Sequence, residues 1–179
     1  MRAVIAGAGA VGASIARELH AHGHEVVVVE ARTDAARKAD VGGARLVLGD
    51  ACDLTVLEQC GALEADVLVA ATGDDRVNLV CSLLSRSEFG VGRTVARVNN
   101  PLNDWLFDES WGVDVAVSTP SIMTALVEEA VETGDLVRLL RLEAGGAALS
   151  EFRVPAKHWL EGRAQGRSEA AESAGTPSS

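Results

Sequence analysis

Six short apolar runs alternate with helix-like segments along the chain, and this alternation constrains the fold more than any other feature. Each run is only a few residues long and rich in valine and alanine, which is typical of a parallel strand covered on both faces. The runs are Arg2–Ala6, Glu25–Val29, Arg45–Leu48, Asp66–Ala71, Thr94–Val98 and Val113–Val117. The repeated order predicts an α/β fold of the Rossmann type, with a doubly wound parallel sheet of about six strands.

The segments between the runs carry the predicted helices. These helices are expected over Val11–His22, Asp34–Asp40, Leu54–Cys60, Asp75–Ser87 and Asn103–Glu109. A further helix is expected over Ser121–Glu132, where Pro120 suits the first turn and the hydroxyl of Thr119 can cap the free amides. Gly134 is expected to end it.

Residues after this helix differ in composition, and the chain is expected to have three parts. The nucleotide-binding domain and its last helix would span residues 1–133. A short β extension would span 134–162, with two strands joined at Gly145-Gly146. Residues 163–179 have almost no large apolar side chains and are predicted to be a disordered tail.

Composition narrows the classes of function. The formal net charge is −10 and the pI is near 4.8, without any run of Lys or Arg, which argues against nucleic acid and anionic membrane surfaces as partners. No stretch approaches the roughly 20 apolar residues of a membrane helix, and the start lacks the features of a signal peptide. Three cysteines without C-x-x-C spacing indicate free thiols. A cytoplasmic protein without direct membrane insertion is therefore expected.

A glycine-rich loop follows the first run and opens the first helix, with the spacing G-x-G-x-x-G. Gly7 permits a tight turn, Gly9 lets a diphosphate approach the backbone, and Gly12 lets the helix pack closely. The helix N-terminus directs its free amides toward the phosphates. The predicted phosphate-binding residues are Gly7, Ala8, Gly9, Ala10, Val11 and Gly12.

Glu30 directly follows the second run, about 20 residues after the loop, as the dinucleotide-binding motif requires. Its carboxylate can accept hydrogen bonds from the ribose hydroxyls and would repel a 2′-phosphate, so NAD(H) is the predicted ligand. Arg32 lies two residues on and leaves NADP open. A glycine-rich packing turn that binds no ligand is the alternative.

More polar residues follow the third, fourth and fifth runs. Because ligands bind at the carboxyl ends of strands in open α/β sheets, these residues are expected to converge on one crevice. They are Asp50, Thr72, Gly73, Asp74, Asp75, Asn78, Arg97, Asn99 and Asn100. A buried Arg97 requires a partner, and an ion pair with Asp50, Asp74 or Asp75 is the alternative to a role in ligand binding.

Three stretches, taken in order, resemble the N-terminal domain of Trk-type potassium-uptake regulatory subunits, known as the RCK or KTN domain. They are "GAGAVGASIARELHAHGHEVVVVE", "GDACDLTVLEQCGALEADVLVAATGDDRVNLVCSLLS" and "TVARVNNPLNDWLFDESWGVDVAVSTP". The resemblance implies a non-catalytic domain that binds NAD(H) or adenine nucleotides such as ATP and ADP. It also implies homodimers or larger rings that gate a membrane potassium transporter or channel, with the helix after "STP" as the crossover element between subunits.

The resemblance also implies roles for individual residues. Glycines 7, 9 and 12 would hold the phosphates and Glu30 the ribose, while Arg97 would reach the phosphates or a neighbouring subunit. Asp50 and Ala51 would flank the adenine, and the nucleotide would be edged by Thr72, Gly73 and Asp75. Family members carry a complete second domain, of which residues 135–162 resemble only the opening strands. This implies a short subunit or an incomplete chain.

An NAD(P)-dependent oxidoreductase and a redox-sensing module of the same fold are the alternative functions. Hydride transfer usually needs a proton donor beside the nicotinamide. The chain has no tyrosine, and its histidines are His20, His22, His24 and His158. The first three span a helix end, so they do not share a face and no metal site is expected.

Several other residues have two interpretations. Asp74 and Asp75 suit a helix N-cap better than acid–base catalysis, so no catalytic residue is predicted. Cys81 is expected in the core, whereas a functional thiol at Cys52 stays open because it lies close to the predicted adenine edge. Trp105 and Trp111 are expected to cover an edge of the core or to contact a second subunit.

Overall fold

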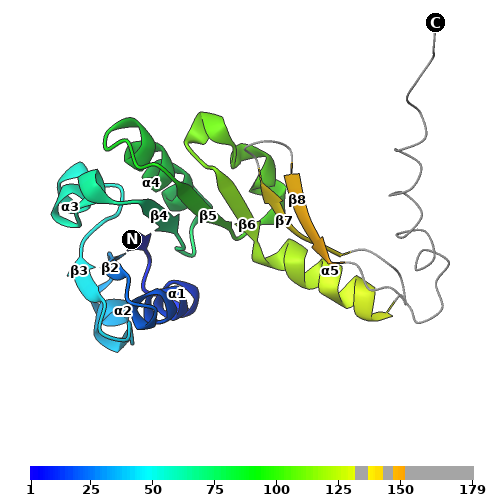
Figure 1. The fold of residues 1–179 in the computed structure, drawn as a ribbon, viewed down its shortest axis with the longest axis horizontal. Coiled ribbons are helices and arrows are strands. Elements are labelled where there is room, and N and C mark those ends of the chain that lie inside the picture. The colour runs from blue at the N-terminus through cyan, green and yellow to red at the C-terminus, as the bar shows by residue number, and fades with distance from the viewer. Residues whose placement is uncertain (132–136, 143–146, 152–179) are drawn as a thin grey trace, which may run out of the picture.

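The computed structural model describes residues 1–131, 137–142 and 147–151, with side chains through residue 128. Its centre is a sheet with the strand order β3-β2-β1-β4-β5-β6-β7-β8, in which the first six strands are parallel and the last two pairings antiparallel (Figure 1). The parallel strands are β1 (Arg2–Ala6), β2 (Glu25–Glu30), β3 (Arg45–Leu48), β4 (Val67–Ala70), β5 (Thr94–Val98) and β6 (Val115–Ser118). The predicted Rossmann-type sheet is confirmed.

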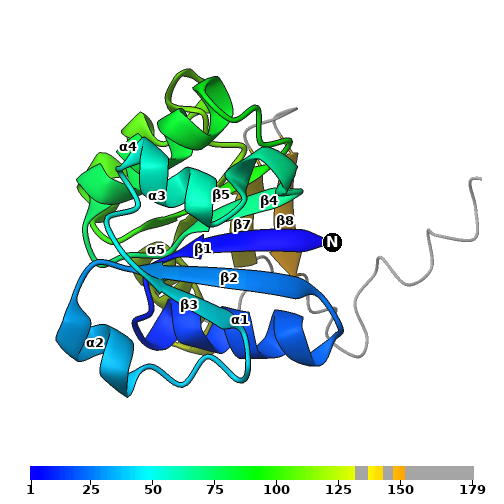
Figure 2. The ribbon, with the colours of Figure 1, turned by 90° about the vertical axis from the view of Figure 1, so that its left-hand side faces the viewer.

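Helices connect the parallel strands and cover both faces of the sheet. In Figure 2, α1 and α2 lie on one side of the sheet, and α3 and α4 lie on the other. The α-helices are α1 (Ala10–Ala21), α2 (Thr33–Lys38), α3 (Leu54–Gln59), α4 (Asp75–Ser87) and α5 (Thr119–Val131). Short 3₁₀ helices are η1 (Ala62–Glu64), η2 (Pro101–Leu106) and η3 (Glu109–Trp111).

The core is divided between the two faces of the sheet by the alternation of side chains along each strand. Ile5 of β1 packs in one cluster with residues of α1 such as Ile15. Val4, one position earlier, packs in the opposite cluster with Leu57 of α3 and Cys81 of α4. Because both faces are buried, the strands have no polar alternation. The predicted core position of Cys81 is confirmed.

The predicted helix over Asn103–Glu109 is wrong, because this segment consists of two separate 3₁₀ helices. The side chain of Asn100 accepts from the backbone amide of Leu102 at 3.1 Å and starts η2. That of Asp108 accepts from the amide of Ser110 at 2.9 Å and starts η3. Trp111 packs against the core as expected. Trp105 is 75% exposed, so it does not cover the core, and its contact with a second subunit stays a prediction.

The helix α5 begins at Thr119, two residues before its predicted start. Ser118, not Thr119, acts as the cap, because its hydroxyl lies 3.3 Å from the amide of Ser121. Thr119 is already helical. Gly134, expected to end this helix, lies outside the described residues.

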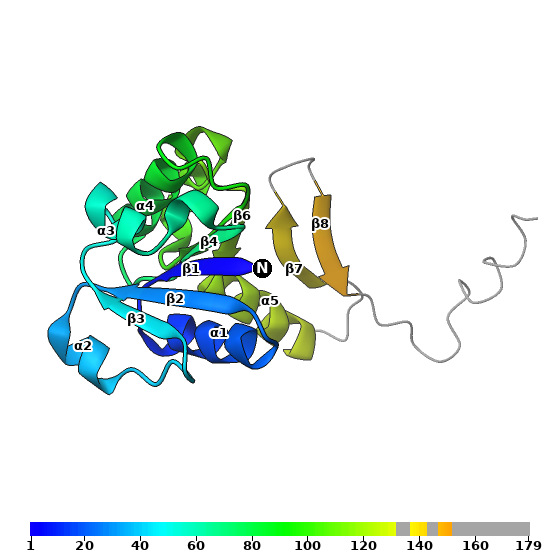
Figure 3. The ribbon, with the colours of Figure 1, turned by 60° about the vertical axis from the view of Figure 1, so that its left-hand side comes forward.

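Beyond α5, two strands continue the sheet past β6. They are β7 (Val137–Leu142) and β8 (Ala147–Glu151), which pair antiparallel, and Figure 3 shows them side by side. The Gly145-Gly146 turn and the tail at 163–179 lie outside the described residues, and the boundaries of the three predicted parts stay predictions. Among the helices that the structure describes, none has both the length and the apolar character to cross a membrane.

Candidate functional site

A cavity of about 580 Å³ lies at the carboxyl ends of the parallel strands. The chain runs from β1 outward to β2 and β3, and then returns to place β4 on the other side of β1. Ligands of doubly wound sheets bind at this reversal of strand order, and the volume is in the range of small-molecule sites. The predicted residues that line the cavity are Gly7, Gly9, Glu30, Asp50, Ala51, Thr72, Gly73 and Arg97.

Other predicted residues do not line this cavity. Ala8, Ala10, Val11 and Gly12 form the loop and first turn behind it, and Asp75 faces another direction. Asp74 was expected at the crevice and does line it, as does Arg32, which left NADP open in the sequence. Asn78, Asn99 and Asn100 were expected there too, but they do not line the cavity. The residues that sequence reasoning missed are mainly small or apolar, and their only signal was adjacency to predicted positions: Val29, Ala31, Ala35, Gly49, Ala71 and Val77.

The three motif glycines have different structural reasons. Gly7 has φ +102°, and a Cβ there would lie 3.0 Å from the Cα of Thr72. A Cβ on Gly12 would lie 2.0 Å from the carbonyl oxygen of Gly7. At Gly9, a Cβ would meet no atom within 4 Å. The fold itself therefore requires Gly7 and Gly12, whereas the missing side chain of Gly9 leaves space at the cavity wall.

Glu30 stands at the end of β2, and backbone amides orient its carboxylate. One oxygen accepts from the amide of Ala8 at 2.8 Å, and the other accepts from the amide of Arg32 at 3.0 Å. Each carboxylate oxygen can accept a second hydrogen bond. The group can therefore receive hydroxyl donors from the cavity while it keeps both backbone contacts.

Arg97 brings a positive charge to the cavity from the end of β5. Its Nε is buried and has no hydrogen-bond partner among the residues that the structure describes. Within the described part of the chain, no carboxylate forms an ion pair with Arg97, so the predicted alternative pairing with Asp50, Asp74 or Asp75 is wrong. A buried guanidinium nitrogen without a partner is energetically costly. An anionic ligand would remove that cost.

Asp74 serves the helix α4 rather than a reaction. Its carboxylate accepts from the backbone amide of Arg76 at 2.9 Å, as an N-cap does, and forms an ion pair of 2.7 Å with the side chain of Arg76. These hydrogen bonds lower the pKa of Asp74 to about 2. The predicted N-cap is confirmed at Asp74.

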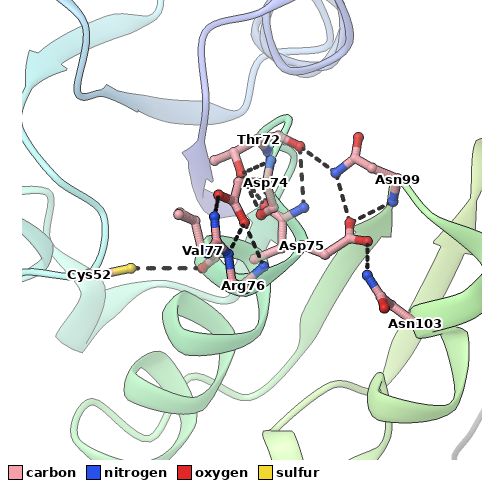
Figure 4. A network of polar contacts seen from close by, with 9 residues as sticks. Cys52, Thr72, Asp74, Asp75, Arg76, Val77, Asn99 and Asn103 are labelled. Atoms are coloured by element: carbon pink, nitrogen blue, oxygen red, sulfur yellow. Dashed lines mark hydrogen bonds and ion pairs between the residues drawn. The ribbon is translucent and has the colours of Figure 1, made fainter.

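Asp75, the next residue, is buried and joins α4 to the segment after β5. Its carboxylate accepts from the amides of Asn99 and Asn100 and from the side chain of Asn103, at 2.6, 3.0 and 2.8 Å (Figure 4). Burial opposes the charged form of Asp75, but these hydrogen bonds outweigh it and hold the pKa below its ordinary value. Asp75 therefore holds the start of α4 and the segment after β5 together next to the cavity.

Asn78 of α4, which was expected in the crevice, instead supports the cavity from behind. Its side chain is fully buried. The amide oxygen accepts from the backbone nitrogen of Thr72 at 3.0 Å, and the amide nitrogen donates to the carbonyl oxygen of Arg97 at 2.8 Å. Asn78 thus ties the end of β4 to the end of β5 and sets the positions of two cavity residues.

Cys52 and the histidines bring no reactive group to the cavity. Burial, reinforced by the charge of Asp50, raises the pKa of Cys52 to about 11, so its thiol stays protonated at neutral pH. His20 lies in the last turn of α1, His22 caps that helix, and His24 precedes β2. In the part of the chain that the structure describes, no three His, Cys, Asp or Glu residues are grouped as metal ligands.

The TrkA-N domain family matches residues 3–119, which cover the six parallel strands except the first residue of β1. The chain belongs to the TrkA-N domain family. A TrkA-N relative, the Trk system potassium uptake protein TrkA of Mycobacterium tuberculosis, is 53% identical over 155 residues, which are 87% of this chain and 70% of the relative. The resemblance that the sequence predicted is confirmed.

Two solved structures share the TrkA-N fold. The GsuK channel bound to NAD has a TM-score of 0.57 and 25% identity, over 65% of this chain and 21% of that chain. GsuK bound to ADP has a TM-score of 0.64 and 24% identity, over 74% of this chain and 34% of that chain. The second likeness shows the fold alone.

Proposed function

We propose that this TrkA-N chain is a cytoplasmic nucleotide-binding regulatory subunit of a membrane potassium uptake system and carries out no chemistry itself. The naming of its mycobacterial relative as a Trk potassium uptake protein supports this proposal. The partner would be a membrane potassium transporter or channel subunit, reached from the inner face of the membrane.

The proposed ligand is NAD(H), with ATP or ADP as the second choice. One observation carries the proposal: the open backbone at Gly9, the oriented carboxylate of Glu30 and the unpaired Nε of Arg97 belong to a single cavity. These groups are complementary to a diphosphate joined to a ribose. The GsuK structures bound to NAD and to ADP add support from the same fold.

Each cavity residue then has a proposed role. The backbone at Gly9 and the first turn of α1 hold the diphosphate, and Arg97 neutralises part of its charge. Glu30 accepts from the ribose hydroxyls. Asp50 and Ala51 flank the adenine, while Thr72 and Gly73 edge the nucleotide. Asp75 acts as a positioning residue, because its carboxylate is already occupied by donors from three asparagines.

Regulation would follow from a difference in nucleotide affinity between two subunit arrangements. Coupling of about 1–3 kcal/mol, typical of allosteric proteins, changes an affinity about 5- to 150-fold. Such gating requires at least two subunits, so we propose a homodimer or a larger ring. The helix α5 is the proposed crossover element.

The oxidoreductase alternative has less support. Side chains that line the cavity within the described residues include no histidine, lysine or tyrosine that could pass a proton to a carbonyl substrate. The thiol of Cys52 is protonated at neutral pH. Steady loss of NADH absorbance with any of a panel of carbonyl substrates would favour an enzyme.

A melting screen with NAD, NADH, NADPH, ATP and ADP tests the nucleotide assignment directly. A ligand at 100 times its Kd should raise the free energy of unfolding by about 2.7 kcal/mol. We expect NAD or NADH to do so. If only ATP or ADP stabilises the protein, the proposed ligand is an adenine nucleotide instead of NAD(H), and the proposed regulatory role is unchanged. If no nucleotide stabilises the protein and none gives heat in calorimetry, the proposal is overturned.

A further inference from the structure

Arg32 is a second cation at the cavity, on the ribose side. It follows Glu30 by two residues and lines the same cavity. Its backbone amide donates to the carboxylate of Glu30 at 3.0 Å. In the sequence alone, this arginine is a candidate to bind the 2′-phosphate of NADP, because an arginine at this position of the fold accommodates that group.

The structure gives Arg32 a partner. Asp34 receives both ends of the guanidinium, with Nε to Oδ1 at 3.2 Å and a terminal nitrogen to Oδ2 at 2.7 Å. This two-point geometry is the one that an arginine would use for a phosphate. Asp34 therefore occupies one edge of the guanidinium and neutralises its charge.

The charges on this side of the cavity also oppose a phosphate. Two carboxylates, Glu30 and Asp34, stand against one guanidinium, which leaves a formal charge of −1. A ribose with a free 2′-hydroxyl brings no charge and can donate to Glu30. A 2′-phosphate would meet net repulsion and would compete with Asp34 for the charge of Arg32.

We propose that Asp34 is a specificity-determining residue, which restricts the cavity to nucleotides with a free 2′-hydroxyl by holding Arg32 in an ion pair. This inference rests on the proposed nucleotide site and deepens it. Asp34 acts through Arg32 and is therefore a positioning residue. Glu30 recognises the hydroxyl, and Asp34 withholds the cation that would accept a phosphate.

Calorimetry with NAD and NADP tests this role, because the two ligands differ only in the 2′-phosphate. Asp34→Asn should tighten the binding of NADP about five- to twentyfold, since an exposed ion pair and one nearby repulsive charge are removed. Its NAD affinity should stay within about twofold. The double variant Arg32→Gln/Asp34→Asn should lose the gain, because the released guanidinium is then absent.

Glu109→Gln is the matched control. It removes one negative charge from η3, away from the cavity, and should leave the affinities for both ligands within about twofold. If NAD binds and Asp34→Asn leaves NADP unimproved, the role of Asp34 is refuted. The role of Asp34 is also refuted if the double variant still binds NADP more tightly, or if Glu109→Gln tightens NADP binding as Asp34→Asn does. If neither ligand binds to any of these proteins, the nucleotide site itself is wrong.

Discussion

The carboxylate of Glu30 accepts a hydrogen bond of 2.8 Å from the backbone amide of Ala8. This contact joins the end of β2 to the glycine loop after β1, so the proposed ribose acceptor and the proposed phosphate loop form one unit. The second oxygen of Glu30 accepts from the amide of Arg32 at 3.0 Å. Both oxygens keep a lone pair for a ligand.

Replacement of Glu30 by glutamine should weaken the binding of NAD about tenfold to a hundredfold. The NH2 group of glutamine cannot accept a hydrogen bond from a ribose hydroxyl, and it would face one of the two backbone amides that donate to Glu30. The loss of a hydrogen bond to a charged group corresponds to about 1.5–3 kcal/mol. Titration calorimetry measures the effect, and urea unfolding of the same variant separates it from lost stability. An affinity within twofold of the original protein would contradict the role of Glu30.

Gly9 and Gly12 form a matched pair of tests. Gly9→Ala should leave the free energy of unfolding within about 0.5 kcal/mol, because the new Cβ meets no atom within 4 Å. It should nevertheless remove most of the NAD-dependent rise in melting temperature. Gly12→Ala should lower the free energy of unfolding by about 1–3 kcal/mol, because the new Cβ would lie 2.0 Å from the carbonyl oxygen of Gly7. Undiminished NAD stabilisation in Gly9→Ala would count against the phosphate loop.

Arg97→Gln should weaken the binding of nucleotides about tenfold or more, because the phosphates lose a charged donor. The salt dependence of the affinity should also decrease. The variant should not be markedly less stable, since the Nε of Arg97 has no partner to lose in the described part of the chain. Arg76→Gln is the control: its side chain is 88% exposed and pairs with Asp74, so binding should be unchanged. Equal losses in both variants would refute the specific role of Arg97.

Asp75→Asn should lower the free energy of unfolding by about 2–4 kcal/mol at pH 7, because it removes a buried charge that accepts from several donors. The pKa of Asp75 is lower in the folded than in the unfolded protein. Its contribution is therefore complete above the unfolded value of about 4 and is lost as the pH falls through the folded pKa. Urea unfolding from pH 7 to pH 3 should show the two proteins converging. A constant difference over this range would contradict the charge-based explanation.

Cys52 should react slowly with iodoacetamide at pH 7. With a pKa of about 11, roughly one thiol in ten thousand is ionised, against a few per cent for an ordinary cysteine. Labelling, followed by mass spectrometry, should therefore be several hundredfold slower in the folded protein than in urea. Rapid labelling of folded Cys52 would reopen its redox role.

Features that depend on neighbours in the chain could be predicted from the sequence. Apolar runs predict strands buried on both faces because their side chains alternate between the two clusters, as Val4 and Ile5 do. The glycine spacing predicts the loop because backbone geometry is local. The segment from Asn100 to Trp111 was mispredicted as one helix. The side chains of Asn100 and Asp108 each cap the start of a separate 3₁₀ helix, and the residue pattern does not show this division.

By itself, the sequence determined the six parallel strands, most of the helices between them, the glycine loop and the acid at residue 30. Only the tertiary structure decided how the adjacent acids Asp74 and Asp75 differ: the first caps α4, and the second binds asparagines about 24 residues further along the chain. It also decided that, among the described residues, Arg97 lacks an ion pair while Arg32 has one. The physical reason is that the state of a charged group depends on which donors and charges surround it in space, and folding brings those together from distant positions.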